Sequence, residues 1–353
     1  MLNLKFMRYG VLDLTSATEG DIRDAATEDF MAMVKAVGPA FGKVAELSGI
    51  DQLAVECVLA QDFVKAVEAR MRRFGEDDRE AFTTERVGGF AIAKNLSQVE
   101  DDSLIAIVFD ASVWAGMDGA ARARKVATMA HELAHPIMTR VRRMSGALDG
   151  VVFPSVTLTE VARSNARIDW DEFRAEDIAD MVLQGMTTVD DPAGKPPRPL
   201  PLTEISLPGY IEQALMQLGA AYPAWADRVQ TYREWKMTLG DMWFQTLRDL
   251  DQMRTLMAMT LGCLGVESRE SIDPAVSALP AYRLYFGEPW EAYIAAIRRV
   301  PSITTPQNHR DAEREILAAG EASFRQALVA LGLTADDLPD RQCEVHVTEP
   351  KRI

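Results

Sequence analysis

Apolar residues recur at helical spacing through most of the first 74 residues. The pattern runs through FMAMVKAVGPAFGKVAEL (30–47) and LAVECVLAQDFVKAVEARMRRF (53–74), with apolar positions three and four residues apart. It predicts helices from about Asp21 to Phe74. Within them, the segment Val44–Leu59 resembles a helix-turn-helix, with Ala45 and Gly49 at the tight positions. A charged stretch, Gly75–Glu80, would connect this region to the next.

The pattern then changes to short apolar segments. Gly89–Ala93 and Leu104–Phe109 are rich in β-branched or aromatic residues and are bounded by polar turn residues, so both predict strands. Val151–Leu158 predicts another strand. The region therefore combines a small sheet with helices.

A long helix is predicted between these strands, from about Asp118 to His135. Its apolar stripe would be formed by Val126, Ala130, Leu133 and Ile137. Pro136 lacks a backbone N–H and disfavours helical geometry at the preceding residue, so the helix should end or kink there.

The second half of the chain predicts helices at Asp169–Gln184, 210–264, Trp290–Arg299 and Arg310–Leu331. Asp190–Pro208 contains six prolines, which predicts a linker. We therefore expect an α+β, predominantly helical protein with a small sheet. Its predicted regions are an N-terminal helical region (1–78), a metal-binding core (79–190), a proline-rich linker (191–209) and a C-terminal helical region (210–353).

Composition limits the possible partners. The chain has 353 residues with 53 acidic and 38 basic side chains, a formal net charge of -15. This charge argues against broad nucleic-acid binding and against docking on anionic lipid. Three widely spaced cysteines and a first segment without a signal-peptide pattern predict a cytoplasmic protein with reduced thiols. The longest apolar stretch is too short to span a bilayer.

The most specific chemical signal is the sequence His131-Glu132-Leu133-Ala134-His135. It is an H-E-x-x-H motif inside a predicted helix, where residues four apart lie on one face. The two imidazoles can then bind one zinc ion, and Glu132 can act as general base toward a water molecule. The chain has only four histidines, so a chance occurrence of this motif is rare. The alternative without a metal site is a pair of surface histidines beside a solvated glutamate.

A catalytic zinc site normally has three protein ligands. No third histidine lies nearby in the sequence, so a carboxylate is the economical choice. Glu172 and Glu176, one turn apart in DWDEFRAEDIAD (169–180), are candidates, and Glu160 and Asp169 remain alternatives.

The stretch from Leu104 to Asp180 resembles the ImmA/IrrE family of zinc metallopeptidases. The matching pieces are the predicted strand Leu104–Phe109, the AHE-x-x-H motif at Ala130–His135 and Glu176-Asp177-Ile178-Ala179-Asp180. The resemblance implies a zincin-like core in which His131, His135 and Glu176 hold zinc, as in a gluzincin, and Glu132 activates water. It also implies that substrate pairs with Leu104–Phe109, and the alternative is that this segment is a buried structural strand. The chain departs from the family at Ala134, where glycine is usual.

These observations predict a zinc-dependent metallopeptidase acting on a protein or peptide substrate. The alternative is a zincin-fold sensor or protein-binding module without turnover, in which Val44–Leu59 would be a degenerate helix-turn-helix. The second helix of that module, DQLAVECVLAQD, has no Arg or Lys to contact DNA, so nucleic acid is not the expected partner.

Overall fold

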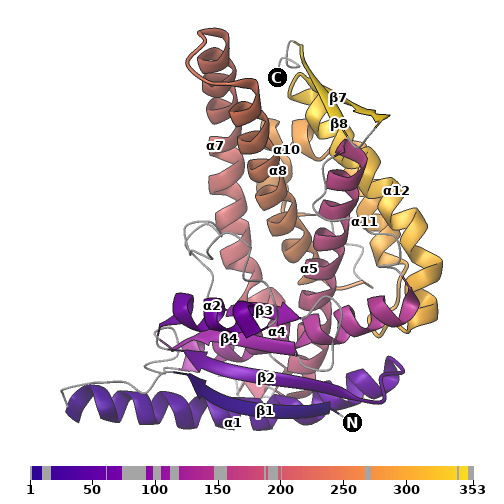
Figure 1. Cartoon of the computed structure of the whole chain (residues 1–353). Helices are drawn as coiled ribbons and strands as arrows, with labels where there is room; N and C mark the ends of the chain where they lie inside the picture. The colour runs from indigo at the N-terminus through magenta and orange to yellow at the C-terminus, as the bar shows by residue number, and fades with distance from the viewer. Residues whose placement is uncertain are drawn as a thin grey trace. The chain divides into compact units, whose positions relative to one another are not determined.

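The structure of the chain is a computed structural model. It describes residues 2–9, 17–60, 62–73, 93–97, 105–111, 119–146, 157–186, 188–189, 198–199, 201–266, 272–339 and 342–348. Within these ranges the protein is predominantly helical and has small sheets, which confirms the predicted α+β, mostly helical class (Figure 1). None of the described helices is both long and apolar enough to cross a membrane.

The helices and strands follow each other along the whole described chain. The helices are α1 (Ala17–Leu47), α2 (Phe63–Arg73), α4 (Gly119–Ser145), α5 (Leu158–Met186), α6 (Leu202–Ile205), α7 (Leu207–Arg233), α8 (Leu239–Gly262), α9 (Pro274–Ser277), α10 (Pro280–Tyr285), α11 (Gly287–Arg298) and α12 (Pro306–Ala330). The strands are β1 (Leu2–Tyr9), β2 (Leu53–Ala60), β3 (Ala93–Ser97), β4 (Ile105–Asp110), β5 (Thr188–Val189), β6 (Arg198–Pro199), β7 (Leu333–Leu338) and β8 (Gln342–Val347).

These elements form two compact units. Unit 1 comprises Met1–Met144, Ile178–Pro201 and Ile303–Pro306. Unit 2 comprises Ser145–Asp177, Leu202–Ser302 and Gln307–Ile353. The boundary passes through α5, so this helix belongs to both units.

Unit 1 is built around a four-stranded sheet of order β1-β2-β4-β3. The first three strands run parallel and β3 pairs antiparallel with β4. Alternate residues of a strand point to opposite faces. Val58 and Val108 therefore share one face, where they pack with Phe63 of α2. Phe109 points to the other face and contacts Phe30 of α1, with 5.1 Å between ring centroids. Helices thus cover both faces of the sheet.

Leu53–Ala60 is a strand, which makes the predicted helix-turn-helix at Val44–Leu59 wrong. Helix α1 ends at Leu47, and Gly49 follows in the left-handed conformation with φ +77°. The N–H of Ile50 donates to the carbonyl of Ala45 at 2.9 Å, as in a glycine-terminated helix end. The eight residues of β2 (Leu53–Ala60) are almost all buried, as is typical of a central parallel strand.

Strand β4 confirms the strand predicted at Leu104–Phe109, but it has no unpaired edge. It pairs with β2 on one side and with β3 on the other, and its residues are buried up to Phe109. The expectation that substrate pairs with this strand is therefore wrong. Of the predicted strand Gly89–Ala93 only Ala93 is described, as the first residue of β3. Of Val151–Leu158, residues 151–156 lie outside the described part, and Leu158 begins α5.

Helix α4 does not end at Pro136 but continues to Ser145. The proline removes one backbone hydrogen bond. The residues that follow it offset this loss, since Ile137 and Val141 are 2% and 3% exposed. Ala130 and Leu133 of the predicted stripe are also buried.

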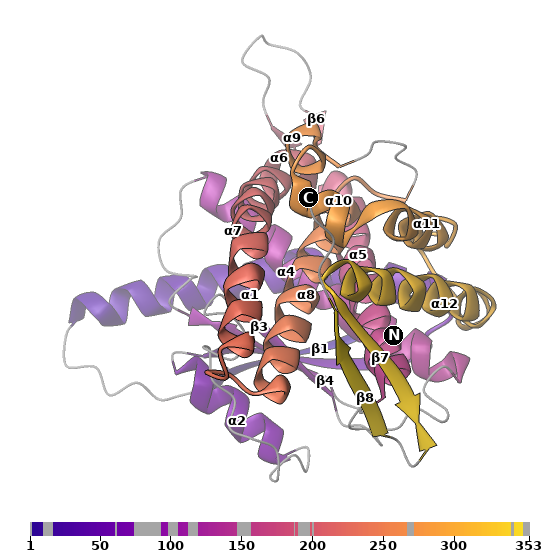
Figure 2. The ribbon, with the colours of Figure 1, turned by 90° about the horizontal axis from the view of Figure 1, so that it is seen from above.

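Unit 2 consists of helices packed around a large apolar core. Helices α7 and α8 lie side by side as an antiparallel hairpin, and Figure 2 shows them from above. The longest helices confirm the predicted helical segments after residue 169, although α5 begins earlier, at Leu158. The predicted linker contains the short strand β6 and helix α6, and α7 already begins at Leu207. After α12, β7 and β8 form an antiparallel hairpin that the sequence did not predict.

Candidate metal centre

His131 and His135 face each other from successive turns of α4. Their Nε2 atoms are 3.1 Å apart, and the two rings are nearly perpendicular. His131 is buried and His135 is half-buried. This arrangement follows from the helical spacing of four residues, which places both side chains on one face of the helix.

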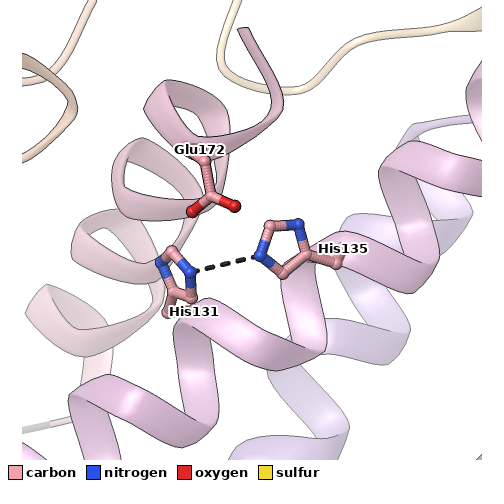
Figure 3. Close-up of side chains that lie close together, drawn as sticks. All are labelled: His131, His135 and Glu172. Atoms are coloured by element: carbon pink, nitrogen blue, oxygen red, sulfur yellow. Dashed lines mark hydrogen bonds between the residues drawn. The ribbon is translucent and has the colours of Figure 1, made fainter. Parts of the chain in front are cut away.

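Glu172 of α5 completes a group of three possible metal ligands. One ligand atom from each of His131, His135 and Glu172 lies within 4.8 Å of the others. Figure 3 shows the carboxylate of Glu172 pointing toward the two imidazoles. Within the described part of the chain this is the group of at least three histidine, cysteine or acidic side chains that can hold a metal ion.

The residues present fit a zinc ion. Two imidazole nitrogens bound to zinc at 2.0–2.1 Å are separated by about 3.3 Å at the tetrahedral angle. The observed separation of 3.1 Å between the Nε2 atoms is close to this value. Two nitrogen donors and one carboxylate are also the donor set of a known class of catalytic zinc sites, with a fourth position left for water. The pair of histidines therefore needs little rearrangement to bind zinc.

Glu176, the third ligand implied by the family resemblance, is placed differently. It is buried, and its Oε1 accepts a hydrogen bond of 2.7 Å from the hydroxyl of Tyr210. Its Oε2 accepts a contact of 3.5 Å from the thiol of Cys263. Burial and the negative charge of Glu176 hold the pKa of Tyr210 well above its usual value, so this hydroxyl keeps its proton and remains a donor. The structure brings Glu172, not Glu176, to the histidines.

The two other candidate carboxylates have structural partners. Glu160 forms a capping box at the start of α5: Thr157 N–H donates to Glu160 Oε2 at 3.1 Å, and Glu160 N–H donates to Thr157 Oγ1 at 3.2 Å. Asp169 is completely buried, accepts a hydrogen bond from Arg254 Nε of α8 and forms an ion pair with the same guanidinium. Neither belongs to the group around the histidines.

Glu132 lies between the two histidines in the motif and is half-exposed. It is not part of the three-ligand group, which agrees with a role other than binding the metal ion. The remaining histidines lie elsewhere. His309 stacks on Trp170, with 4.4 Å between ring centroids, and His346 of β8 lies 3.4 Å from Asp336.

Sequence reasoning missed three residues, in α7, in α8 and directly after α8, that contact the acidic side chains of α5. Tyr210 and Cys263 bind Glu176, and Arg254 binds Asp169. No spacing rule connects them to α5, because they are 34 to 87 residues away in the sequence. One signal was present: Arg254 lies at the helical spacing of Leu250, Met257 and Leu261, and an arginine in such an apolar stripe needs a buried partner.

The comparisons with known proteins identify no relative. No protein-family model, no curated protein and no solved structure matches this chain.

Proposed function

We propose that the protein is a zinc-dependent metallopeptidase with a zincin-type site. His131, His135 and Glu172 hold the metal ion, and Glu132 is the general base. The observation that carries the proposal is the convergence of the two histidine Nε2 atoms and the Glu172 carboxylate within 4.8 Å, on an H-E-x-x-H helix. This assignment replaces Glu176 of the family resemblance by Glu172 as the third ligand.

The proposed role of each residue follows from the chemistry of its side chain. A bound zinc ion supplies a Lewis acid that acidifies water and polarises a carbonyl group. Glu132 accepts the proton of the attacking water and delivers it to the leaving amine. His131, His135 and Glu172 position the reacting groups and remain unchanged through the reaction.

A protein or peptide is the proposed substrate, because a peptide bond has both the carbonyl to be polarised and the amine to be protonated. The outer strand β3 pairs with β4 alone among the described strands. An extended peptide can add to such an edge through main-chain hydrogen bonds. We therefore assign the substrate strand to β3 (Ala93–Ser97) in place of β4.

Metal content tests the site directly. Wild-type protein purified from zinc-containing medium should carry close to one zinc ion per chain, measured by atomic emission. His135→Ala should carry almost none, because two remaining ligands hold zinc weakly. His346→Ala is the matched control, since His346 is exposed and lies outside the group, and it should keep its zinc. A wild type without zinc would refute the proposal.

Glu132→Gln then tests the chemistry. The variant should keep zinc and lose cleavage of peptide libraries by a factor of at least about 100, the lower range for general-base catalysis. A metal-binding regulatory module without turnover, the alternative from the sequence, predicts zinc but no cleavage in either protein. Cleavage that survives in Glu132→Gln would exclude Glu132 as the base.

A further inference from the structure

Helix α7 has an outward face without charged side chains. Its inward face packs into the apolar core of unit 2 through Ala214, Leu218 and Trp225. No residue from 216 to 226 is charged, although 26% of the chain is. The exposed side chains that the structure describes in this stretch are those of Met216, Ala220, Pro223, Ala224 and Ala226. A helix face turned to water usually carries polar or charged side chains. This face therefore suits contact with another apolar surface.

A tryptophan follows α7 at a position that favours glycine. The N–H of Trp235 donates to the carbonyl of Tyr232 at 2.9 Å, and the N–H of Lys236 donates to the carbonyl of Thr231 at 3.0 Å. This is the hydrogen-bond pattern of a helix end closed by a left-handed residue. Trp235 has φ +60° and is, among the described residues, the one non-glycine with a positive φ. Its side chain is 92% exposed, so packing within the chain does not offset the strained backbone.

Oppositely charged side chains lie beyond the two ends of the uncharged stretch. Glu212 and Arg233 are both exposed, and neither has an ion pair with another described residue. They are 21 residues apart, which is about 32 Å along the helix.

These positions are complementary to those of a second copy of the same helix. If two copies of α7 lie antiparallel about a two-fold axis midway along this interval, Glu212 of each copy comes next to Arg233 of the other. A two-fold contact repeats each pairing, so two ion pairs enclose the uncharged faces. The alanines near the axis are small and allow close approach of the helices. Trp235 then lies beside the start of the other α7, where Pro208 is exposed.

We propose that two copies of this chain form a symmetric dimer through the outward faces of α7, packed antiparallel. The inference goes beyond the metallopeptidase proposal and does not depend on it. A second copy is the partner because the charges at the two ends of this face complement each other. The face is about 30 Å long and 10–12 Å wide, so two copies would bury roughly 1,000 Å² in total. This area is at the low end for specific complexes, which predicts a dissociation constant in the micromolar range.

Sedimentation velocity of the full chain, from about 1 to 200 µM, tests for the dimer. The mass of the wild type should rise from 39.1 kDa toward twice that value with concentration. Ala224→Lys places a charge near the axis and should weaken dimerisation at least about tenfold. The matched control is Ala295→Lys, at an exposed alanine of α11, which should dimerise like the wild type. A wild type that stays monomeric, or an unchanged dimer in Ala224→Lys, would overturn the inference.

Exchanging the two charges tests the antiparallel arrangement. Glu212→Arg alone and Arg233→Glu alone each bring like charges together at both ends of the contact, so each should weaken dimerisation at least about tenfold. The double variant reverses both signs and should recover most of the wild-type affinity. Recovery is not expected if the two residues act only on the folding of α7. A double variant as weak as the single ones would contradict the reciprocal pairing.

Discussion

Glu172 and Glu176 are separated by one turn of α5 but have different surroundings. Glu172 is half-exposed and points toward two imidazoles, whereas both oxygens of Glu176 accept contacts from Tyr210 and Cys263. Breaking the Tyr210–Glu176 hydrogen bond would leave a buried hydroxyl without its acceptor, which is costly. The local hydrogen bonds therefore favour Glu172 as the metal ligand.

Glutamine substitutions at the two positions give opposite predictions for zinc content. Glu172→Gln should lose most of its zinc, because a neutral amide is a poor zinc ligand. Glu176→Gln should retain zinc and become less stable toward denaturant by about 1 kcal/mol, since its hydrogen bonds are weakened but not removed. The zinc content of the two purified variants shows whether Glu172 or Glu176 is the metal ligand. The reverse result would return the ligand role to Glu176.

The predictability of the site differs from residue to residue. His131, Glu132 and His135 could be predicted because their geometry depends on the local spacing of one helix. The choice between Glu172 and Glu176 could not be predicted, since both lie on the same face of α5. It depends on Tyr210, which belongs to a helix that begins 21 residues after α5 ends.

At the scale of elements, α5 and α8 approach each other closely at Gly262. A Cβ atom added there would lie 2.4 Å from the carbonyl oxygen of Phe173 and 2.9 Å from Cβ of Glu176. The absence of a side chain at Gly262 therefore lets the end of α8 pack against the turn of α5 that carries Glu176. Backbone atoms cannot move aside cheaply, so this contact should be sensitive to substitution.

Gly262→Ala should lower the free energy of unfolding by about 1–3 kcal/mol, the usual cost of overpacking. Gly219→Ala is the control, because a Cβ atom at Gly219 in α7 has no atom within 4 Å. Alanine is the better helix former, so this substitution should stabilise the protein by up to about 1 kcal/mol. Urea denaturation measures both. Equal effects at the two glycines would contradict the close approach of the helices.

Elements with long amphipathic patterns were predictable, whereas among the short apolar segments β4 was predicted and β2 was not. The patterns behind α5 and α12 extend over several turns, so the predicted helices are confirmed. The eight residues of β2 are apolar almost throughout and carry two alanines, so their sequence fits a buried helix as well as a strand. Pairing with β1 and β4 makes this segment a strand and not a helix, and β1 was not predicted.

At the scale of the whole molecule, unit 2 buries charged side chains whose removal from water costs free energy. Arg254 and Asp169 are fully buried among Trp290, Tyr293 and Phe324. Removing charges from water costs free energy that a buried ion pair only partly returns. The metal-free protein should therefore be less stable at pH values at which the buried carboxylates of Asp169 and Asp251 are ionised.

This argument predicts how the stability of the metal-free protein depends on pH. Burial gives Asp251 a folded-state pKa of about 6, above its ordinary value of 3.8. Its contribution is therefore fully present below about pH 3.8 and is lost as the pH rises through 6. Asp169 acts in the same direction, and its contribution is lost as the pH rises through about 7.

Asp251→Asn removes the contribution of Asp251 to the pH dependence of stability and leaves the contribution of Asp169. In the presence of a chelator at pH 8, the variant should be more stable than wild type by about 3 kcal/mol, the free energy that corresponds to a shift of this size. At pH 5 the difference should be about half as large, because Asp251 is then mostly protonated in the folded state but mostly ionised in the unfolded state. Urea denaturation at both pH values gives the comparison. A variant less stable than wild type at pH 8 would show that Asp251 stabilises the fold.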